Sequence, residues 1–350
     1  MLNFTIGPVM SPPEVIAIAS QSTPYFRTPE FSALMKENES LMLRFLKAPT
    51  GSKCAFLTAS GTGAMESVVM NVTMEDDKII VINGGTFGQR FVDLCRLYNR
   101  NFQEVTCEFG KQLKREQLSG LEDGTVMLIN MHETSSGLLY DMEMVSEFCR
   151  ENRILLIVDA ISSFLADELD MASLGAGVVI TSSQKALACQ PGVSAVALGA
   201  EAMERVDRNQ EACLYLSLKE ALKDGQRGQT PYTPAVSILM QIHARLRAIE
   251  ARGGVESERK AIGYIAEAFR LGIANLPYRM VADTPSNAVT ALHPTSAQAS
   301  NVVNILKDQY NIWVCPNGGE YKDTVFRVGH VGNISAQDNT VLLRALRMIA

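Results

Sequence analysis

Residues 154–159 read Ile-Leu-Leu-Ile-Val-Asp, in which an expected strand, the apolar run Ile154–Val158, is followed by the carboxylate of Asp159. A second apolar run, Val178–Thr181, follows it, and Ser182-Ser183-Gln184-Lys185 comes directly after that run. Strands that are apolar throughout are typical of a parallel sheet buried on both faces. We therefore expect Asp159 and Lys185 to lie at the same edge of such a sheet, because the carboxyl ends of parallel strands meet there.

Short apolar runs alternate with longer helical patterns on both sides of this stretch. Helices are expected at 62–72, 87–98 and 143–151, where apolar residues recur on one face. This alternation predicts an α/β fold with a mainly parallel, seven-stranded sheet between layers of helices. The remaining five strands are expected at Cys54–Thr58, Lys78–Ile82, Phe102–Cys107, Val126–Asn130 and Val193–Leu198.

The pattern changes after about residue 230. Two long helices are expected at 234–252 and 257–271, and shorter strands and helices alternate from there to the end, which is typical of a smaller α+β domain. We expect a large domain over residues 15–250 and a small domain formed by residues 1–14 and 251–350. The shorter elements are expected at 278–282, 289–293, 297–309, 312–315, 324–328 and 336–348.

Composition excludes several classes of protein. The 350 residues carry a formal charge of −6, and 47% of them are hydrophobic, so the chain is too apolar to be disordered. Mild acidity without a basic block argues against nucleic acid or an anionic membrane surface as partner. The chain shows neither a secretory signal nor an apolar run long enough to span a membrane, and its seven cysteines stand singly, without a zinc-binding spacing. We expect a cytoplasmic protein with reduced thiols and no metal site.

Polar and glycine residues follow several predicted strands at the same sheet edge. Ser60-Gly61-Thr62 opens a predicted helix, where glycine permits close approach and the free N–H groups attract an anion such as phosphate. Small residues also occur between a strand and a helix for turn and capping reasons alone. The stretch matches neither the Walker A sequence nor the GxGxxG fingerprint, so a bound nucleotide is disfavoured.

Asp159 and Lys185 together suggest a particular chemistry. An aspartate that holds a pyridinium N–H and a lysine that forms a Schiff base are the two groups that pyridoxal phosphate requires. Each residue also has a plainer interpretation, since Asp159 can cap the next helix and Lys185 can reach solvent. Phe87, in a glycine-rich turn, can stack on the cofactor ring or be an ordinary core aromatic.

Seven short motifs, in the same order along the chain, give it a family resemblance. The chain resembles the class V aminotransferases of the fold-type I pyridoxal-phosphate enzymes, a group that includes alanine–glyoxylate, serine–glyoxylate and 2-aminoethylphosphonate–pyruvate transaminases. The motifs span nearly the whole chain: Ile6-Gly7-Pro8, residues 60–66 (SGTGAME), Phe87-Gly88-Gln89-Arg90, Glu133-Thr134-Ser135-Ser136-Gly137, residues 158–163 (VDAISS), residues 183–187 (SQKAL) and Phe326-Arg327-Val328-Gly329.

The resemblance implies a role for each matching residue. Lys185 would carry the Schiff base and move the substrate proton, and Asp159 would keep the pyridine nitrogen protonated. The expected cofactor contacts are Ser60, Gly61 and Thr62 at the phosphate, Phe87 on the ring, Thr134 near the ring hydroxyl and Gln184 beside the lysine.

Substrate and partner contacts are also implied by the resemblance. Arg327 would pair bidentately with the substrate carboxylate, which a planar guanidinium matches better than lysine does. An exposed strand arginine is the plainer alternative. Gly7 would belong to an N-terminal turn over the substrate. The active site would be shared across a homodimer, with Thr230 and Thr233 of residues 229–234 the best candidates for contacting the partner's phosphate.

The expected function is transfer of an amino group from a small amino acid, of the alanine or serine type, to a 2-oxo acid such as pyruvate or glyoxylate by a ping-pong mechanism. A 2-aminoethylphosphonate or phosphonoalanine donor is an alternative, and Arg27 can meet a second anion or simply lie at the surface. A cysteine desulfurase-like lyase is less favoured, because Gln184 stands where those enzymes usually have histidine and Cys315 ends a predicted strand as an expected structural thiol. A catalytically silent protein of this fold is disfavoured by the presence of Lys185, Asp159 and Arg327 together.

Overall fold

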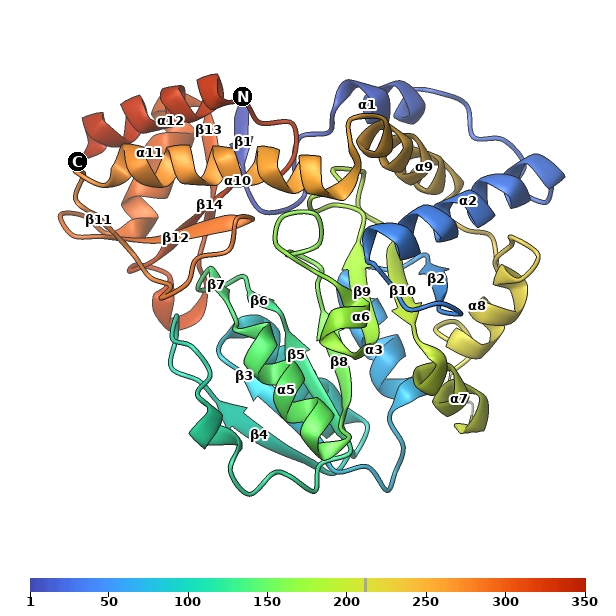
Figure 1. Ribbon diagram of the computed structural model, residues 1–350. Coiled ribbons are helices and arrows are strands. Elements are labelled where there is room, and N and C mark those ends of the chain that lie inside the picture. Colours follow the sequence, from blue (N-terminus) through green and yellow to red (C-terminus); the bar gives the residue numbers. More distant parts are fainter. Residues whose placement is uncertain (211–212) are drawn as a thin grey trace.

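The computed structural model describes residues 1–210 and 213–350, which form a seven-stranded sheet, a five-stranded sheet and a two-stranded hairpin with helices packed around them (Figure 1). Neighbouring strands from β9 to β4 run parallel, whereas β10 is antiparallel to both β2 and β9. The prediction of a mainly parallel, seven-stranded sheet is therefore confirmed. Its strands lie in the order β2 (Lys53–Leu57), β10 (Ser194–Leu198), β9 (Ala176–Ser182), β8 (Leu155–Asp159), β5 (Val126–Asn130), β3 (Ile79–Asn83) and β4 (Phe102–Thr106).

The strands of this sheet are apolar because helices cover both of its faces. Every residue of β3, β5, β8 and β10 is buried. Alternate residues belong to different cores: Ile79 and Val81 of β3 pack in one hydrophobic cluster, and Ile80 and Ile82 in another. This alternation follows from the two-residue period of a strand, and it explains why no polar face is visible in the sequence.

Helices and a short hairpin accompany the large sheet. The sequence predicted α3, α4, α5 and α9 but missed α1, α2, α6, α7 and α8. The hairpin is formed by β6 (His132–Glu133) and β7 (Leu138–Leu139), and a 3₁₀ turn covers Arg115–Leu118. The helices are α1 (Pro13–Ala19), α2 (Pro29–Phe45), α3 (Gly61–Val72), α4 (Thr86–Leu97), α5 (Met142–Asn152), α6 (Met171–Leu174), α7 (Ala200–Arg208), α8 (Leu218–Gly225) and α9 (Val236–Ala251).

The second sheet joins the two ends of the chain. The N-terminal strand β1 pairs in parallel with β13, so the first residues lie beside C-terminal elements (Figure 1). This pairing supports the proposed small domain of residues 1–14 and 251–350. The strand order is β1 (Leu2–Phe4), β13 (Ile312–Pro316), β14 (Phe326–Gly329), β12 (Val289–Pro294) and β11 (Tyr278–Met280), and the accompanying helices are α10 (Gly254–Ile273), α11 (Ala299–Tyr310), α12 (Ala336–Ile349) and the 3₁₀ turn Gly319–Tyr321.

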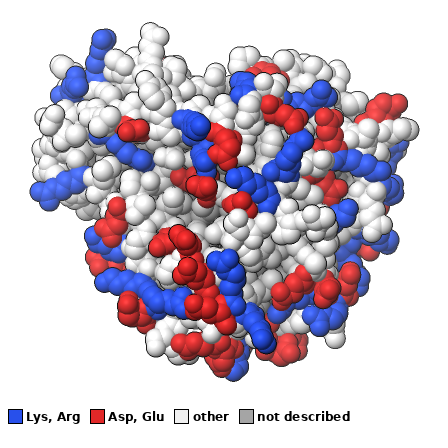
Figure 2. Space-filling model, viewed as in Figure 1, with Lys and Arg blue, Asp and Glu red and all other residues white. Residues whose placement is uncertain are grey.

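Charged side chains of both signs are interspersed on the molecular face shown in Figure 2. None of the described helices is long and apolar enough to cross a membrane.

Candidate active site

Asp159 ends β8 at the carboxyl edge of the large sheet, where it pairs with Asn130 on one side and Ile180 on the other. Its side chain is buried, and one carboxylate oxygen accepts the backbone N–H of Ile161 at 2.8 Å. Burial raises the pKa of Asp159 to about 6, while the Ile161 N–H and the positive charge of Arg90 act in the opposite direction. At neutral pH the carboxylate is therefore mainly ionised inside an apolar strand environment.

Lys185 follows β9, and the structure brings it into the electrostatic range of Asp159. Burial lowers the pKa of Lys185 to about 8; the nearby Cys315 and Asp159 oppose this shift, and the Arg327 cation adds to it. A lysine attacks a carbonyl only as the neutral amine. The site therefore makes the reactive form accessible near neutral pH, as burial close to cations is expected to do.

Gly7 reaches this lysine from the opposite end of the chain. A β-carbon on Gly7 would stand 2.9 Å from Lys185 Cδ and 3.2 Å from Lys185 Nζ, and the φ of Gly7 is +150°. Both the contact and the backbone angle require glycine. The preceding residue, Ile6, donates its N–H to Cys315 Sγ at 3.4 Å, which fastens the N-terminal segment over the lysine.

The N-terminus of α3 lies against the turn that follows Asp159. Ser60 caps this helix by accepting the Gly63 N–H at 3.4 Å, and it remains exposed to solvent. A β-carbon on Gly61 would come within 2.5 Å of Ile161, two residues after Asp159, so glycine allows the helix end to approach that turn. The free N–H groups of this first turn form a suitable anion-binding position.

Arg90 adds positive charge to that helix end. Its guanidinium donates to Thr62 Oγ1 at 2.9 Å and lies 4.9 Å from the centre of the Phe87 ring. Arg90 thus connects the predicted phosphate residues with the predicted stacking residue. The sequence motif contained Arg90, but nothing in the sequence indicated this contact.

Glu133 holds the turn that carries Phe87. The carboxylate is fully buried and accepts the backbone N–H groups of Phe87 and Gly88, at 3.2 and 3.0 Å, and the Asn130 side-chain amide at 3.0 Å. Ser135 also donates to it from both backbone and hydroxyl. These donors compensate the carboxylate for its loss of water and fix the half-buried Phe87 in position.

Thr134 and Gln184 are the two remaining predicted cofactor residues. Thr134 is buried, and its hydroxyl oxygen is 2.8 Å from Ser162 Oγ. Gln184 precedes Lys185 and is half-buried, and its side-chain oxygen accepts the Ser182 hydroxyl at 2.6 Å. Both predicted cofactor residues therefore have side chains held in place by a neighbouring serine.

Arg327 lies on β14 directly across from Cys315 of β13. Its guanidinium donates to the Pro316 carbonyl at 2.7 Å and to the Thr134 carbonyl at 3.3 Å. Burial lowers its pKa, and its charge in turn lowers the pKa of Lys185. Arg327 is therefore half-buried and close enough to Lys185 to act on its charge, so the alternative of an exposed strand arginine does not apply.

Cys315 lies inside the site. Besides facing Arg327, it accepts the Ile6 N–H, and it influences the pKa values of both Lys185 and Arg327. The sequence placed this thiol correctly at the end of a strand but did not indicate that the strand borders the lysine. The register of β13 and β14, which cannot be read from the sequence, is what places Cys315 opposite Arg327.

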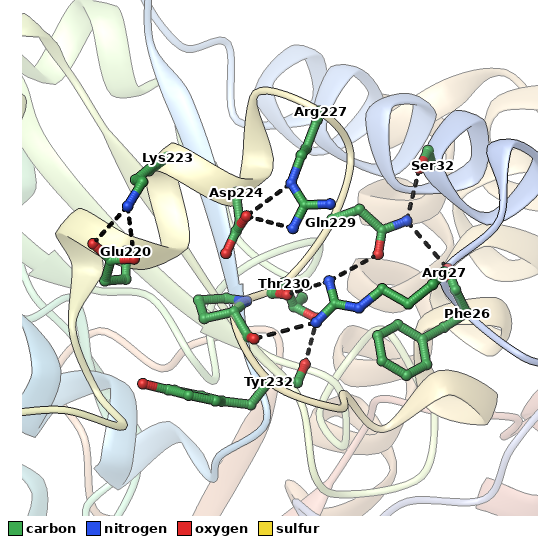
Figure 3. Close-up of polar contacts among 11 residues, drawn as sticks. Phe26, Arg27, Ser32, Glu220, Lys223, Asp224, Arg227, Gln229, Thr230 and Tyr232 are labelled. Carbon is green, nitrogen blue, oxygen red and sulfur yellow. Dashed lines mark hydrogen bonds and ion pairs between the residues drawn. The ribbon is translucent and has the colours of Figure 1, made fainter.

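Residues 229–234 form a separate arrangement that is fastened to Arg27 (Figure 3). The Arg27 guanidinium donates to the Thr230 carbonyl at 2.9 Å and the Pro231 carbonyl at 3.2 Å, and Gln229 donates to Ser32 at 2.7 Å. Arg27 is therefore occupied in holding this segment.

The two threonines of that segment differ. Thr230 is buried and donates its hydroxyl to the Tyr232 carbonyl at 2.7 Å, whereas Thr233 is exposed. Among the described residues, no hydrogen bond joins either threonine to the phosphate-binding candidates of the same chain at residues 60–62.

Known proteins resemble this chain in sequence and in fold. A model of the aminotransferase class V family matches residues 18–320. The serine–glyoxylate aminotransferase of Arabidopsis thaliana is 28% identical, over 99% of this chain and 89% of that protein. The 2-aminoethylphosphonate–pyruvate transaminase of Klebsiella pneumoniae is 25% identical, over 85% of this chain and 83% of that protein. The crystal structure of an alanine–glyoxylate aminotransferase from Nostoc has the same fold, with a TM-score of 0.93 at 24% identity, covering 99% of this chain and 94% of that one.

Proposed function

The chain belongs to the class V aminotransferases, which are pyridoxal-phosphate-dependent enzymes, and from this premise we propose that it moves an amino group from alanine, serine or a similar small amino acid to pyruvate or glyoxylate in two half-reactions. The observation that carries this proposal is the meeting of Lys185, Asp159 and Arg327 at one edge of the large sheet. The three side chains supply an amine of lowered pKa, a buried carboxylate and a carboxylate-binding cation.

The donor set fits pyridoxal phosphate. Lys185 supplies the amine, Asp159 supplies a buried anion for the pyridinium N–H, and Gly61 lets the N-terminus of α3 approach the turn after Asp159. When bound, the cofactor acts as an electron sink for the bond that breaks at the substrate Cα.

Each side chain then has a defined task. Lys185 Nζ takes the proton from the substrate Cα and later returns a proton, a role for which a pKa near the working pH is suitable. Asp159 remains ionised and keeps the ring nitrogen protonated. Phe87 would stack on the cofactor ring, Gln184 would contact the cofactor beside the lysine and Thr134 would face the ring hydroxyl. Glu133 maintains the position of Phe87.

Phosphate binding is assigned to the first turn of α3. Ser60, Gly61 and Thr62 offer hydroxyls and free backbone N–H groups, and Arg90 adds a positive charge through its contact with Thr62. This combination favours a phosphate dianion over a neutral group.

The substrate carboxylate is assigned to Arg327, with Gly7 closing the opposite side. The guanidinium already donates to two carbonyls, which orient it without neutralising its charge. A planar cation held in this way is suited to bidentate pairing with a carboxylate.

The state of Arg27 favours an uncharged donor side chain. A phosphonate substrate needs a second cationic position, and Arg27, which holds the carbonyls of Thr230 and Pro231, is not among the charges that act on Lys185 or Arg327. We therefore prefer the alanine or serine type of donor. A 2-aminoethylphosphonate or phosphonoalanine donor is the second candidate, because the Klebsiella pneumoniae transaminase carries that substrate in its name.

We also propose a homodimer with a shared active site. Ser60 is exposed at the phosphate position, and Thr233 is exposed in a segment held by Arg27, which suits a contact with the phosphate of the partner subunit. We propose a cytoplasmic location as well. Five of the seven thiols, at residues 54, 95, 107, 149 and 189, are buried, which is consistent with a reducing compartment.

A half-reaction tests the proposed function. The holoenzyme incubated with alanine or serine alone is expected to convert its cofactor to the pyridoxamine form, and subsequent glyoxylate or pyruvate is expected to restore the original absorbance. Conversion only by a phosphonate donor would shift the assignment to the second candidate.

Cysteine is the informative control, because Cys315 lies close to Lys185. Release of sulfide from cysteine without formation of the pyridoxamine form would replace the transaminase assignment with a lyase of the same fold.

A further inference from the structure

Three buried side chains form a continuous hydrogen-bonded series beside the lysine. His132 Nδ1 lies 2.9 Å from Ser162 Oγ, and Ser162 Oγ lies 2.8 Å from Thr134 Oγ1. The residues come from β6, from the turn after β8 and from the loop after β6, and all three are buried. Because Ser162 has a single hydroxyl proton, it donates to one neighbour and accepts from the other.

The imidazole of His132 is neutral. Burial, together with the charges of Lys185, Arg327 and Arg270, lowers the pKa of His132 to about 3. A neutral imidazole carries one N–H, so one ring nitrogen donates and the other accepts.

The surroundings of the ring favour the proton on Nδ1. Nε2 of His132 is buried and has no hydrogen-bonding partner among the described residues. An N–H directed into such surroundings would be an unpaired buried donor, which proteins rarely tolerate, whereas a bare ring nitrogen is the less costly arrangement. With the proton on Nδ1, His132 donates to Ser162, and the direction of the whole series is set.

The direction of the series determines where the hydroxyl proton of Thr134 can point. Ser162 accepts from His132 and therefore donates to Thr134, whose own hydroxyl proton is then free to point away from the series. The Thr134 carbonyl accepts from Arg327, and the neighbouring Glu133 carboxylate is already occupied by backbone and side-chain donors, so neither redirects the hydroxyl.

We propose that His132 and Ser162 are positioning residues that make the Thr134 hydroxyl a hydrogen-bond donor toward the ring oxygen of the cofactor. This inference rests on the proposed function, in which Thr134 faces that oxygen. A donor stabilises the anionic form of a ring oxygen, so the series keeps the bound cofactor in its deprotonated state to lower pH.

The test is the visible absorbance of the holoenzyme as a function of pH, which needs no turnover. S162A and H132L are each expected to raise the midpoint of the absorbance change by about half to one pH unit, the effect of losing one hydrogen bond to a charged form. H132N is expected to restore most of the wild-type midpoint, because the asparagine amide can donate from nearly the position of Nδ1.

Ser163 provides the matched control. It is adjacent to Ser162, fully buried, and its hydroxyl has no hydrogen-bonding partner among the described residues. S163A makes the same chemical change outside the series and is expected to leave the midpoint unchanged. An equal shift in S163A and S162A would indicate repacking and would overturn the proposal.

A double variant tests whether the effect passes through Thr134. T134V is expected to raise the midpoint as S162A does, and T134V combined with S162A is expected to shift it no further than T134V alone. Additive shifts, or an unchanged midpoint in S162A and H132L, would overturn the proposal while the proposed function stands. Failure of the wild-type protein to bind pyridoxal phosphate would overturn the proposed function, and this inference with it.

Discussion

Gly7 lies so close to Lys185 that a β-carbon on the glycine would stand 3.2 Å from the lysine Nζ. The N-terminal segment therefore borders the lysine, although the two residues are 178 positions apart in the sequence (185 − 7). The contact arises because β1 joins the C-terminal sheet beside β13, which carries the chain past the carboxyl edge of the large sheet. A short strand at the start of the chain thus completes a site built mainly by β8 and β9.

Replacement of Gly7 is the first prediction. G7A is expected to reduce kcat/KM by at least about tenfold, because its methyl group would press on the Lys185 side chain. Steady-state kinetics with alanine and glyoxylate provide the measurement. The control is G51A, which also has a positive φ, +88°, but has no atom within 4 Å of the added methyl group. Equal losses in both variants would show that backbone strain, not contact with the lysine, is responsible.

The pH dependence of cofactor capture follows from Lys185. The neutral amine is the attacking form, and the pKa is lowered to about 8, so the capture rate of the apoenzyme is expected to rise with pH from 7 to 9 with a midpoint near 8. Stopped-flow absorbance after addition of pyridoxal phosphate gives this rate. A rate that stays flat through pH 9 and rises only near 10 would mean that the amine is not perturbed.

The lowered pKa of Lys185 also makes the free energy of unfolding depend on pH. Because the pKa of this lysine is lower in the folded state than in the unfolded state, the unfolded state binds more protons between pH 8 and 10.5. The contribution of Lys185 to the free energy of unfolding therefore rises with pH across that window.

Arg327 is predicted to determine affinity for the donor carboxylate. R327K keeps the charge but loses the planar pair of donors, so KM for alanine is expected to rise by about 10- to 100-fold with the cofactor still bound. Arg279 lies exposed on β11 of the same sheet, and R279K is expected to leave KM unchanged. An unchanged KM in R327K would place the substrate carboxylate elsewhere.

Arg27 is predicted to support the shared site through residues 229–234. R27Q removes the donors to the Thr230 and Pro231 carbonyls and is expected to weaken cofactor affinity about tenfold and to promote dissociation of the dimer. Equilibrium dialysis of the cofactor and sedimentation of the protein measure the two effects.

Arg227 supplies the control, since among the described residues its exposed guanidinium pairs with Asp224 alone, just beyond the end of α8 (Figure 3). R227Q is expected to change neither quantity, because exposed pairs of this kind contribute about 0–1 kcal/mol. A monomeric wild-type enzyme with full activity would contradict the shared site directly.

The large sheet was predictable from sequence because its strands are buried on both faces. β5 was predicted with its bounds unchanged, and β3 and β8 each lie one residue further along the chain than predicted. A continuous apolar run marks such a strand without any knowledge of its neighbours. The rule that polar residues gather after parallel strands then located Asp159 and Lys185.

Helix α2 was missed although its signals are present. Thr28 caps the helix by accepting from Phe31, Pro29 occupies its first turn, and the buried residues Phe31, Met35, Leu41, Met42 and Phe45 recur at helical spacing. The polar run Lys36-Glu37-Asn38-Glu39-Ser40 in the middle of the helix concealed this pattern. Strand β1 gave no comparable signal, because three residues form a strand there only by pairing with β13, more than 300 positions away.

The contacts made by the supporting side chains of the site could not be predicted from the sequence either. Glu133, Arg90 and Ser162 belong to the motifs that carried the resemblance, yet their contacts run to residues 28–46 positions away along the chain. Cys315 and Arg327 face each other only because of strand register. Composition and spacing display the residues that do chemistry more readily than the residues that hold them.

Lys185 is the residue on which the proposed chemistry depends, and its identity can be measured directly. The holoenzyme is reduced with borohydride, which fixes the cofactor to the amine that holds it, and the digested protein is then mapped by mass spectrometry. We expect the reduced cofactor on the peptide that contains Lys185 and on no other, and we expect K185A to bind the cofactor without becoming labelled. Labelling of a different lysine in the wild-type protein would contradict the assignment of the active site.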